Sequence, residues 1–312
     1  FGFTRNITFM LLFIALTVGI ISEGVQQGIE RWSARLMPIL LVTLLLLVVY
    51  VLTLDGAIEG LKVYLLPDFE RAMSPSLIIN ALGSAFFSLS LGVGTMLVYG
   101  SYINDSENLP VVGGLVTLVD ISIAVMSGFL VLPAMYVALH NGVEIFTATG
   151  ELISEDTLIF TVLPELFNTM GIAGTVVSFT FFFLMSIAAL TSSISMLEVP
   201  VAYTIEEHGV SRKRSVIVIG VAIAVVSTII LINFEQLFGF VVALTTRYSQ
   251  PLLGFMFCIY AGWIWQRDKV LQEVRKGCPD VENYLFWKIW PSYVRYVCPV
   301  IILAIFAQTV FG

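Results

Sequence analysis

Long apolar segments alternate with short polar connections along the whole chain. Apolar runs of spanning length lie near residues 7–23, 36–54, 77–103, 110–139, 171–205, 215–233, 236–264 and 290–312. An α-helix needs roughly 20 apolar residues to cross a bilayer, whereas a barrel strand needs about 10 residues in alternation. The pattern therefore predicts an all-α integral membrane protein with about eight transmembrane helices.

Small and polar residues interrupt the middle of the third run. Residues 86–94 read FFSLSLGVG and bring Ser88, Ser90, Gly92 and Gly94 into an apolar segment. Glycine leaves the helical conformation easily, and unwound backbone in a bilayer is tolerated only where it faces protein or a water-filled cavity. The stretch therefore predicts a discontinuous helix at a binding site. Close helix packing through the two glycines is the alternative interpretation.

A second polar interruption lies in the fifth run, at residues 186–200, which read SIAALTSSISMLEVP. On an α-helix Ala188, Thr191 and Ser192 share one face, so two hydroxyls and a backbone carbonyl can converge there. Hard cations bind oxygen ligands of this kind. The pattern predicts a sodium site, and the alternative is that the hydroxyls bond back to carbonyls of their own helix.

Asp120 is an ionisable residue inside an apolar run. It lies about ten residues from the start of that run, which corresponds to a depth of roughly 15 Å on an α-helix. Intramembrane carboxylates are costly and are functional by default. The alternative is a carboxylate held at the cytoplasmic boundary or bonded to a neighbouring helix. Glu198, near the end of its own span, is predicted to be structural.

Composition agrees with a membrane protein and argues against soluble chemistry. Hydrophobic residues make up 58% of the chain, charged residues 12%, and the mean hydropathy is +0.96. The net charge of -7 indicates no nucleic-acid partner, because in a membrane chain the placement of basic residues matters more. The three cysteines and two histidines show no metal-ligand or catalytic spacing. We therefore expect no enzyme.

The basic residues predict the orientation of the chain. They gather in alternate connections: Arg31 and Arg35; Arg212, Lys213 and Arg214; Arg267, Lys269, Arg275, Lys276 and Lys288. The positive-inside rule places these connections in the cytoplasm. The stretch 141–170 contains no lysine or arginine and collects acidic residues, so it is predicted to be outside. Its apolar piece, LIFTVLPELF, predicts short helices that form either a lid or a surface cover.

Three stretches carry a resemblance to a known family. GIERWSARLMP, FFSLSLGVGTMLVYGSYI and LTSSISMLEVPVAY resemble the neurotransmitter:sodium symporters, especially their bacterial amino-acid transporters. That resemblance implies an inverted-repeat fold with discontinuous helices, in the cell membrane, most simply a bacterial inner membrane. The first span here corresponds to the family's fourth helix and the last to its eleventh, which implies an amino-terminal truncation.

The resemblance also implies a division of the single membrane domain. Residues 1–55 would be the last two helices of the first repeat, residues 56–265 the second repeat, and residues 266–312 a cytoplasmic connector and final helix. Sodium-coupled symport of an amino acid or similar small amine by alternating access is the implied function. The missing amino-terminal helices would be needed to complete the site. The alternatives are a non-transporting remnant or a structural membrane subunit.

The resemblance finally implies roles for individual residues. The substrate-binding residues would be Phe87, Ser88, Ser90, Val93, Ser192 and Met196. The ligands of two sodium ions would be Ser88 and Asp120 at one site, and Ala188, Thr191 and Ser192 at the other. A cytoplasmic gate would contain Tyr102 and Glu206, with an arginine from the missing helices. Asp120 would make chloride unnecessary, and the absence of any acid from residue 239 to 251 leaves the outer-gate aspartate without a counterpart.

Overall fold

The computed structural model describes residues 2–66, 69, 73–146 and 158–311. These ranges contain helices and no β-strand, so the predicted all-α class is confirmed. Six helices in the described ranges are long and apolar enough to cross a membrane: Phe3–Ser22, Val25–Leu52, Leu109–His140, Gly171–His208, Arg212–Ile232 and Leu285–Val310. The other two predicted spans have a different build.

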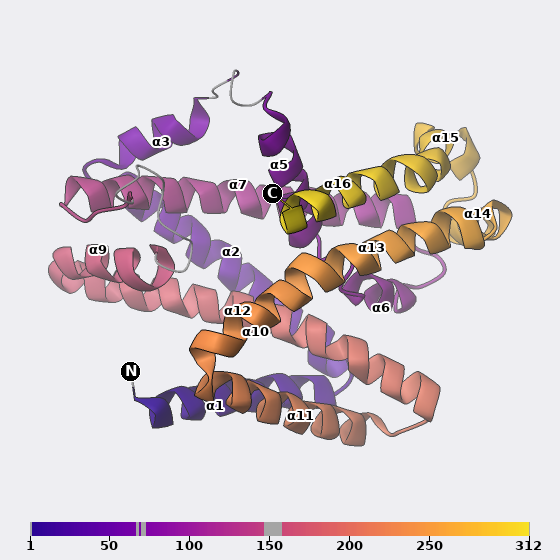
Figure 1. Cartoon of the computed structure of the whole chain (residues 1–312), viewed down its shortest axis with the longest axis horizontal. Coiled ribbons are helices and arrows are strands. Elements are labelled where there is room, and N and C mark those ends of the chain that lie inside the picture. Colours follow the sequence, from indigo (N-terminus) through magenta and orange to yellow (C-terminus); the bar gives the residue numbers. More distant parts are fainter. Residues whose placement is uncertain (1, 67–68, 70–72, 147–157, 312) are drawn as a thin grey trace. The chain divides into compact units, whose positions relative to one another are not determined.

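One of these two spans is interrupted by non-helical residues, and the other consists of four consecutive short helical segments. The run near 77–103 forms α5 (Pro75–Ser88) and α6 (Thr95–Ser101), separated by residues 89–94. The run near 236–264 forms α12 (Phe234–Val242), η3 (Ala243–Ser249), α13 (Gln250–Ile259) and η4 (Tyr260–Ile264), which follow one another directly (Figure 1). The count of eight spans stays a prediction.

The chain divides into two compact units. The first unit is Phe1–Gly28, Glu70–Asp120 and Ser193–Gly312, and the second is Ile29–Phe69 and Ile121–Ser192. The long helices α7 (Leu109–His140) and α10 (Gly171–His208) contribute to both. The predicted division at residues 55 and 265 concerns repeats and stays a prediction.

The second unit packs around α2 (Arg31–Leu52). Its buried residues are Leu40, Leu44, Leu47 and Val51, whose spacing of four, three and four places them on one helical stripe. They join buried residues of α7 and α10 in one apolar cluster. Helix α3 (Ala57–Leu65) lies so close to α7 that a Cβ on Gly60 would be 2.6 Å from a backbone oxygen. Because lipid tails are as apolar as leucine, such close van der Waals packing is what holds membrane helices together.

The predicted outside connection is described only in part. Its acidic residues Glu151, Glu155 and Asp156 lie outside the described residues. The apolar piece forms η2 (Leu158–Val162) and α9 (Leu163–Thr169), so short helices are confirmed here. Leu163 and Leu166 are buried in the cluster of the second unit, which makes this segment a packed cover of that unit. A lid function stays a prediction.

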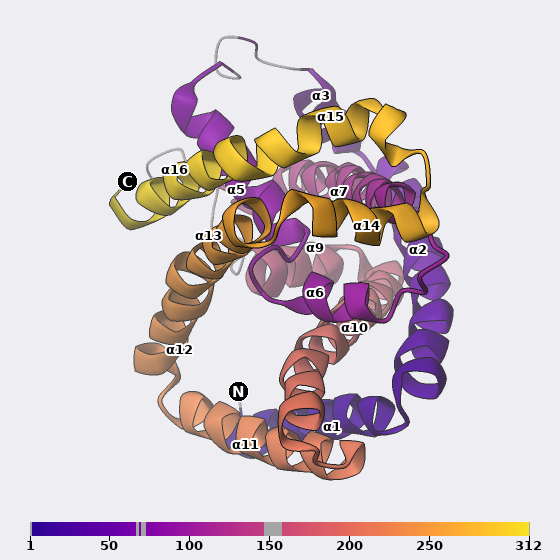
Figure 2. The ribbon, with the colours of Figure 1, turned by 90° about the vertical axis from the view of Figure 1, so that its right-hand side faces the viewer.

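Close helix contacts also build the first unit. Helix α1 (Phe3–Ser22) lies beside α11 (Arg212–Ile232), and a Cβ on Gly220 would be 2.5 Å from the Val18 side chain (Figure 2). Helix α16 (Cys298–Phe311) packs against both α13 and α5. Helix α14 (Arg267–Gly277) leads through η5 (Val281–Asn283) into α15 (Leu285–Ser292), and η6 (Tyr293–Val297) joins α15 to α16.

Candidate functional site

The predicted helix break is present between α5 and α6. The backbone dihedral φ is positive at three positions, 52° at Ser90, 81° at Gly92 and 91° at Gly94. Glycine adopts this left-handed region freely, whereas a residue with a side chain pays about 1–3 kcal/mol for such strain. Ser90 is the only residue other than glycine with positive φ in the described ranges. The strained residue therefore lies in the stretch that the sequence marked as a site.

Helix α13 supports the unwound backbone, which sequence reasoning missed. The side-chain amide of Gln250 donates to the Leu91 carbonyl at 3.0 Å, and Gln250 is only 8% exposed. A Cβ on Gly92 would overlap the Gln250 carbonyl oxygen, so close packing and unwinding both require this glycine. A carbonyl left unpaired in lipid would cost several kcal/mol. The available signal was a glutamine directly before Pro251, at the end of the polar stretch TTRYSQ inside a membrane-length run.

Ser88 and Asp120, both predicted sodium ligands, meet at the break. Ser88 is the last residue of α5, and its hydroxyl donates to Asp120 Oδ1 at 2.8 Å and Oδ2 at 2.9 Å. Asp120 lies eleven residues from the start of α7 at Leu109 and is half-buried. None of the described lysines, arginines or histidines pairs with it. The carboxylate thus offers oxygen ligands and a negative charge that no described basic residue compensates.

The second predicted sodium set lies in the part of α10 that belongs to the second unit. The Thr191 hydroxyl donates to the Ala188 carbonyl at 2.9 Å and to the Ile187 carbonyl at 3.2 Å, and Thr191 is 8% exposed. The alternative of bonding within the helix is therefore observed. The same geometry brings a hydroxyl and a carbonyl oxygen together, while Ser192 is exposed. The assignment of this set to sodium stays a prediction.

The neighbouring hydroxyls of α10 have structural partners. Tyr99 of α6 donates to Ser195 at 2.9 Å, and the buried Thr17 of α1 donates to Ser193 at 3.3 Å. Two of the four hydroxyls in residues 191–195, which read TSSIS, therefore hold helices together within the first unit. Thr191 and Ser192 remain the candidates for ion binding.

The residues predicted to contact substrate differ in their exposure. Phe87 is half-buried and meets Phe86 edge-on, with ring centroids 5.9 Å apart. Ser90 and Val93 lie in the break and are also half-buried. On α10 Ser192 is exposed and Met196 is 53% exposed. Their assignment to substrate stays a prediction.

Tyr102, which was predicted to form a cytoplasmic gate with Glu206, instead contacts an ion pair whose carboxylate, Glu198, is fully buried. The Tyr102 hydroxyl donates to Glu198 Oε1 at 2.6 Å. Arg212 donates through both terminal nitrogens to the Glu198 carboxylate, at 3.0 and 2.6 Å, and through Nε to the Ile21 carbonyl at 2.8 Å. Glu206, which was predicted to share the gate with Tyr102, is exposed on α10. Its gate role stays a prediction, since the partner of Tyr102 is Glu198.

This Tyr102–Glu198–Arg212 cluster joins four helices of the first unit. It connects the end of α6, the interior of α10, the first residue of α11 and the end of α1. Glu198 is 0% exposed, and the Arg212 side chain is 22% exposed. Removing one partner of a buried ion pair costs about 3–5 kcal/mol, because it leaves the other charge uncompensated. Sequence reasoning gave Glu198 a structural role but did not find its arginine.

One buried hydroxyl near the break has no partner in the described part of the chain. Thr95, the first residue of α6, is 6% exposed, and its Oγ1 makes no hydrogen bond there. A buried polar group without a partner costs about 1–3 kcal/mol. The break region therefore contains an unsatisfied hydroxyl in addition to the strained Ser90.

Comparison with known proteins gives a consistent family. The sequence matches the model of the sodium:neurotransmitter symporter family over residues 3–312. It is 33% identical over 311 residues to an uncharacterized sodium-dependent transporter of Haemophilus influenzae, covering 98% of this chain and 65% of that protein. It is 31% identical over 316 residues to the uncharacterized sodium-dependent transporter YhdH of Bacillus subtilis, covering 98% of this chain and 67% of that protein.

A solved structure supports the same conclusion. The crystal structure of MhsT in complex with L-phenylalanine matches with a TM-score of 0.79 and 32% sequence identity, over 97% of this chain and 68% of that chain. The described fold is therefore that of this transporter family. The chain spans about two thirds of the length of the bacterial relatives it matches.

Proposed function

The chain belongs to the sodium:neurotransmitter symporter family, a family of multi-pass membrane transporters that use sodium, and on that premise we propose sodium-coupled symport of an amino acid or similar small amine. The observation that carries the proposal is the contact between Ser88 and Asp120 at the helix break. It supplies hydroxyl and carboxylate oxygens at a point where backbone carbonyls are also freed from the helix. Hard cations bind such oxygen sets.

The charge of Asp120 decides what this site can hold. An ionised carboxylate inside a membrane helix is costly unless a cation compensates it. Arg212 provides that compensation for Glu198, whereas none of the described basic residues does so for Asp120. A bound sodium ion would neutralise Asp120, and the fixed negative charge would make chloride unnecessary at this site.

A second sodium ion is proposed at the hydroxyls of α10. Thr191 and the Ala188 carbonyl already present two oxygens at 2.9 Å from each other. Rotation of the Thr191 hydroxyl proton away from that carbonyl would free both oxygens for a cation. Ser192, exposed and one residue further on, would add a third.

An amino acid is the substrate class that the relatives favour. MhsT, 32% identical to this chain, was crystallised with L-phenylalanine. In this chain Phe87 and Val93 offer apolar contact beside the break, and Ser88 and Ser90 offer polar groups. We infer that the side chain of the substrate meets the apolar pair and that its polar groups meet the unwound backbone. A structural subunit without transport activity is not favoured, because such a role needs no uncompensated intramembrane carboxylate.

The Tyr102–Glu198–Arg212 cluster would hold the cytoplasmic helix ends together in the state described here. The positive-inside rule places Arg212 and its basic neighbours in the cytoplasm. Opening a path on that side would require α6, α10 and α11 to part, and the bidentate ion pair resists this. The cluster is therefore proposed as a positioning element of the transport cycle.

Uptake measurements test the proposal. The full product of the gene is reconstituted in liposomes and supplied with radiolabelled L-phenylalanine under an inward sodium gradient. We expect it to accumulate label until the gradient is collapsed. Asp120→Asn should abolish accumulation, while Asp268→Asn on the exposed part of α14 serves as the matched control. Accumulation by the full product that ignores the sodium gradient would refute the proposal.

A further inference from the structure

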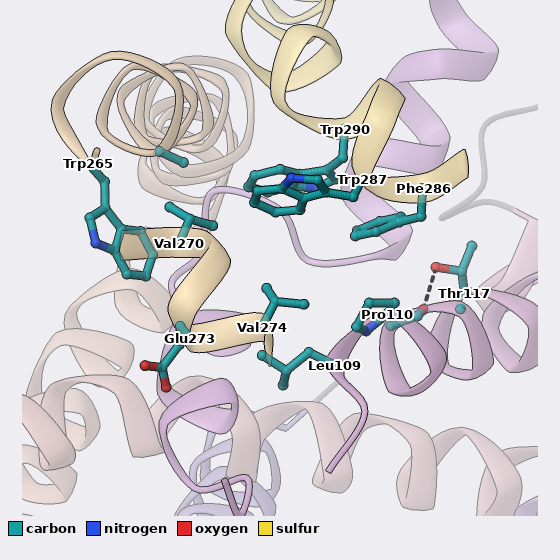
Figure 3. Close-up of a pocket in the computed structure, with 13 residues that line it drawn as sticks. Leu109, Pro110, Thr117, Trp265, Val270, Glu273, Val274, Phe286, Trp287 and Trp290 are labelled. Atoms are coloured by element: carbon teal, nitrogen blue, oxygen red, sulfur yellow. Dashed lines mark hydrogen bonds between the residues drawn. The ribbon is translucent and has the colours of Figure 1, made fainter. Parts of the chain in front are cut away.

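A large apolar cavity opens in the first unit where the start of α7 faces α14 and α15. Its volume is about 740 Å³. Trp265, Phe286, Trp287 and Trp290 contribute aromatic walls, and Trp287 and Trp290 stack with ring centroids 5.8 Å apart (Figure 3). Leu109 and other apolar residues of α7 and α14 close the opposite side. The cavity has the size and character to hold an acyl chain.

A smaller cavity of about 260 Å³ adjoins the first one. The two cavities share the lining residues Ala261, Trp265, Val270 and Trp290. The smaller one adds two arginines that the larger one lacks, Arg267 and Arg295.

These two arginines lie against aromatic rings, and neither pairs with an acid in the described part of the chain. The Arg267 guanidinium carbon lies 5.9 Å from the Trp287 ring centroid, and that of Arg295 lies 4.4 Å from the Trp263 centroid. Neither arginine forms a salt bridge with any described carboxylate. Glu273 lines the larger cavity, but Lys276 donates to it at 3.0 Å. The smaller cavity is therefore cationic, and the larger one apolar.

Both cavities lie at the ends of membrane spans. Leu109 begins α7, and Leu285 begins the span of α15, η6 and α16, so the larger cavity meets the boundary of the apolar layer. The basic residues of the connection 266–288 assign this end to the cytoplasm. Tryptophan is enriched at this level of a bilayer, and the cytoplasmic leaflet carries anionic lipids.

We propose that the two cavities together bind one anionic phospholipid. One acyl chain occupies the larger cavity along the Trp287 and Trp290 rings. The phosphate lies between Arg267 and Arg295, since guanidinium groups donate in a fork that matches phosphate oxygens. A zwitterionic lipid would bring a quaternary ammonium towards two uncompensated guanidinium groups, so a lipid with net negative charge is preferred.

Fluorescence quenching tests the binding. Four of the five tryptophans line the cavities, and Trp32→Phe removes the fifth. The Trp32→Phe variant is placed in nanodiscs of unlabelled phosphatidylcholine. Its tryptophan fluorescence is measured as an increasing fraction of the lipid is replaced by brominated phosphatidylglycerol or, in a parallel series, by brominated phosphatidylcholine. Bromine quenches tryptophan on contact. We expect saturable quenching by brominated phosphatidylglycerol at low fractions, and only weak quenching in proportion to the fraction of brominated phosphatidylcholine.

Two sets of variants separate the headgroup from the chain. Arg267→Gln with Arg295→Gln should raise the half-saturating fraction at least about tenfold, because two charge-assisted contacts are lost. The control is Lys269→Gln with Lys288→Gln, two exposed basic residues that line neither cavity. Gly114→Leu should lower the quenching at saturation, because its Cβ meets nothing within 4 Å and its side chain would enter the larger cavity. Gly239→Leu, equally open but outside both cavities, is its control.

Several results would overturn the proposal. Equal quenching by the two brominated lipids would show that the headgroup is not recognised. An unchanged half-saturating fraction in the arginine double variant would show that Arg267 and Arg295 do not bind the headgroup. Equal behaviour of Gly114→Leu and Gly239→Leu would remove the acyl chain from the larger cavity. Competition by soluble glycerol phosphate at the same concentration as the lipid would show a site for a free anion and no lipid site.

Discussion

Asp120 and Glu198 are both carboxylates inside membrane helices, but their surroundings differ. Glu198 is fully buried and receives a bidentate guanidinium from Arg212 and a hydroxyl from Tyr102. Asp120 is half-buried, and among the described residues only the Ser88 side chain donates a hydrogen bond to it. Glu198 thus has its cation within the chain, whereas none of the described basic residues forms an ion pair with Asp120. The comparison teaches that the Glu198 carboxylate is neutralised by contacts within the fold, and that the cation site proposed at Asp120 rests on its different surroundings.

The strongest way to break this comparison is to remove the charge of Glu198. Glu198→Gln leaves Arg212 without a counter-charge inside the protein, and we expect a loss of about 3–5 kcal/mol in stability. Thermal unfolding of the purified protein in detergent measures it as a lower Tm. Glu206→Gln, at an exposed site on the same helix, is the matched control and should leave Tm unchanged.

A double variant separates the ion pair from simple loss of packing. Glu198→Gln combined with Arg212→Gln should be less destabilised than the sum of the single variants, because no lone charge remains buried. Additive losses would mean that the two side chains do not act as a pair.

Removing the charge of Asp120 is expected to have the next largest effect, which is a loss of transport. Asp120→Ser removes the fixed negative charge, so uptake in the transporting form should fall about 100-fold or become dependent on chloride, which would replace that charge. Uptake is measured with chloride and with gluconate, at equal sodium. Uptake like that of the unmodified protein in gluconate would contradict the role of Asp120.

Thr191 extends the comparison to a proposed sodium site whose oxygen ligands carry no charge. Thr191→Val keeps the shape and removes one oxygen, so the sodium concentration for half-maximal uptake should rise about fivefold to tenfold, at a cost of roughly 1–1.4 kcal/mol. Ser193→Ala, whose hydroxyl serves Thr17, is the control and should leave the sodium requirement unchanged. Equal sodium dependence in both variants would assign Thr191 to structure alone.

The smallest effect is expected at Thr95, whose polar group is buried but uncharged. Thr95→Val removes a hydroxyl without a described partner, so the variant should be as stable as the unmodified protein or up to about 1–2 kcal/mol more stable. Thermal unfolding measures this, with Thr17→Val, which removes a paired hydroxyl, as the destabilised reference. A clear loss of stability in Thr95→Val would show that this hydroxyl has a partner in the folded protein.

Features that depend on local sequence were predictable from the chain itself. The density of apolar residues predicted an all-α membrane protein, because helices satisfy their backbone within each segment. The small residues from Ser88 to Gly94 predicted the break, because positive φ is a local preference that glycine meets at little cost. Asp120 was noticeable as a charge in an apolar run. The resemblance of three motifs then pointed to the family that the comparisons show.

Contacts between distant segments were decided only by the tertiary structure. Arg212 is 14 residues from Glu198 but bonds to it, and Gln250 is 159 residues from the Leu91 carbonyl that it satisfies. The larger apolar cavity needs α7, α14 and α15 together. Periodicity shows which face of a helix is polar, but not which helix meets that face. Pairing is set by close packing and by the cost of leaving a buried charge or carbonyl alone, and both exist only after the helices have come together.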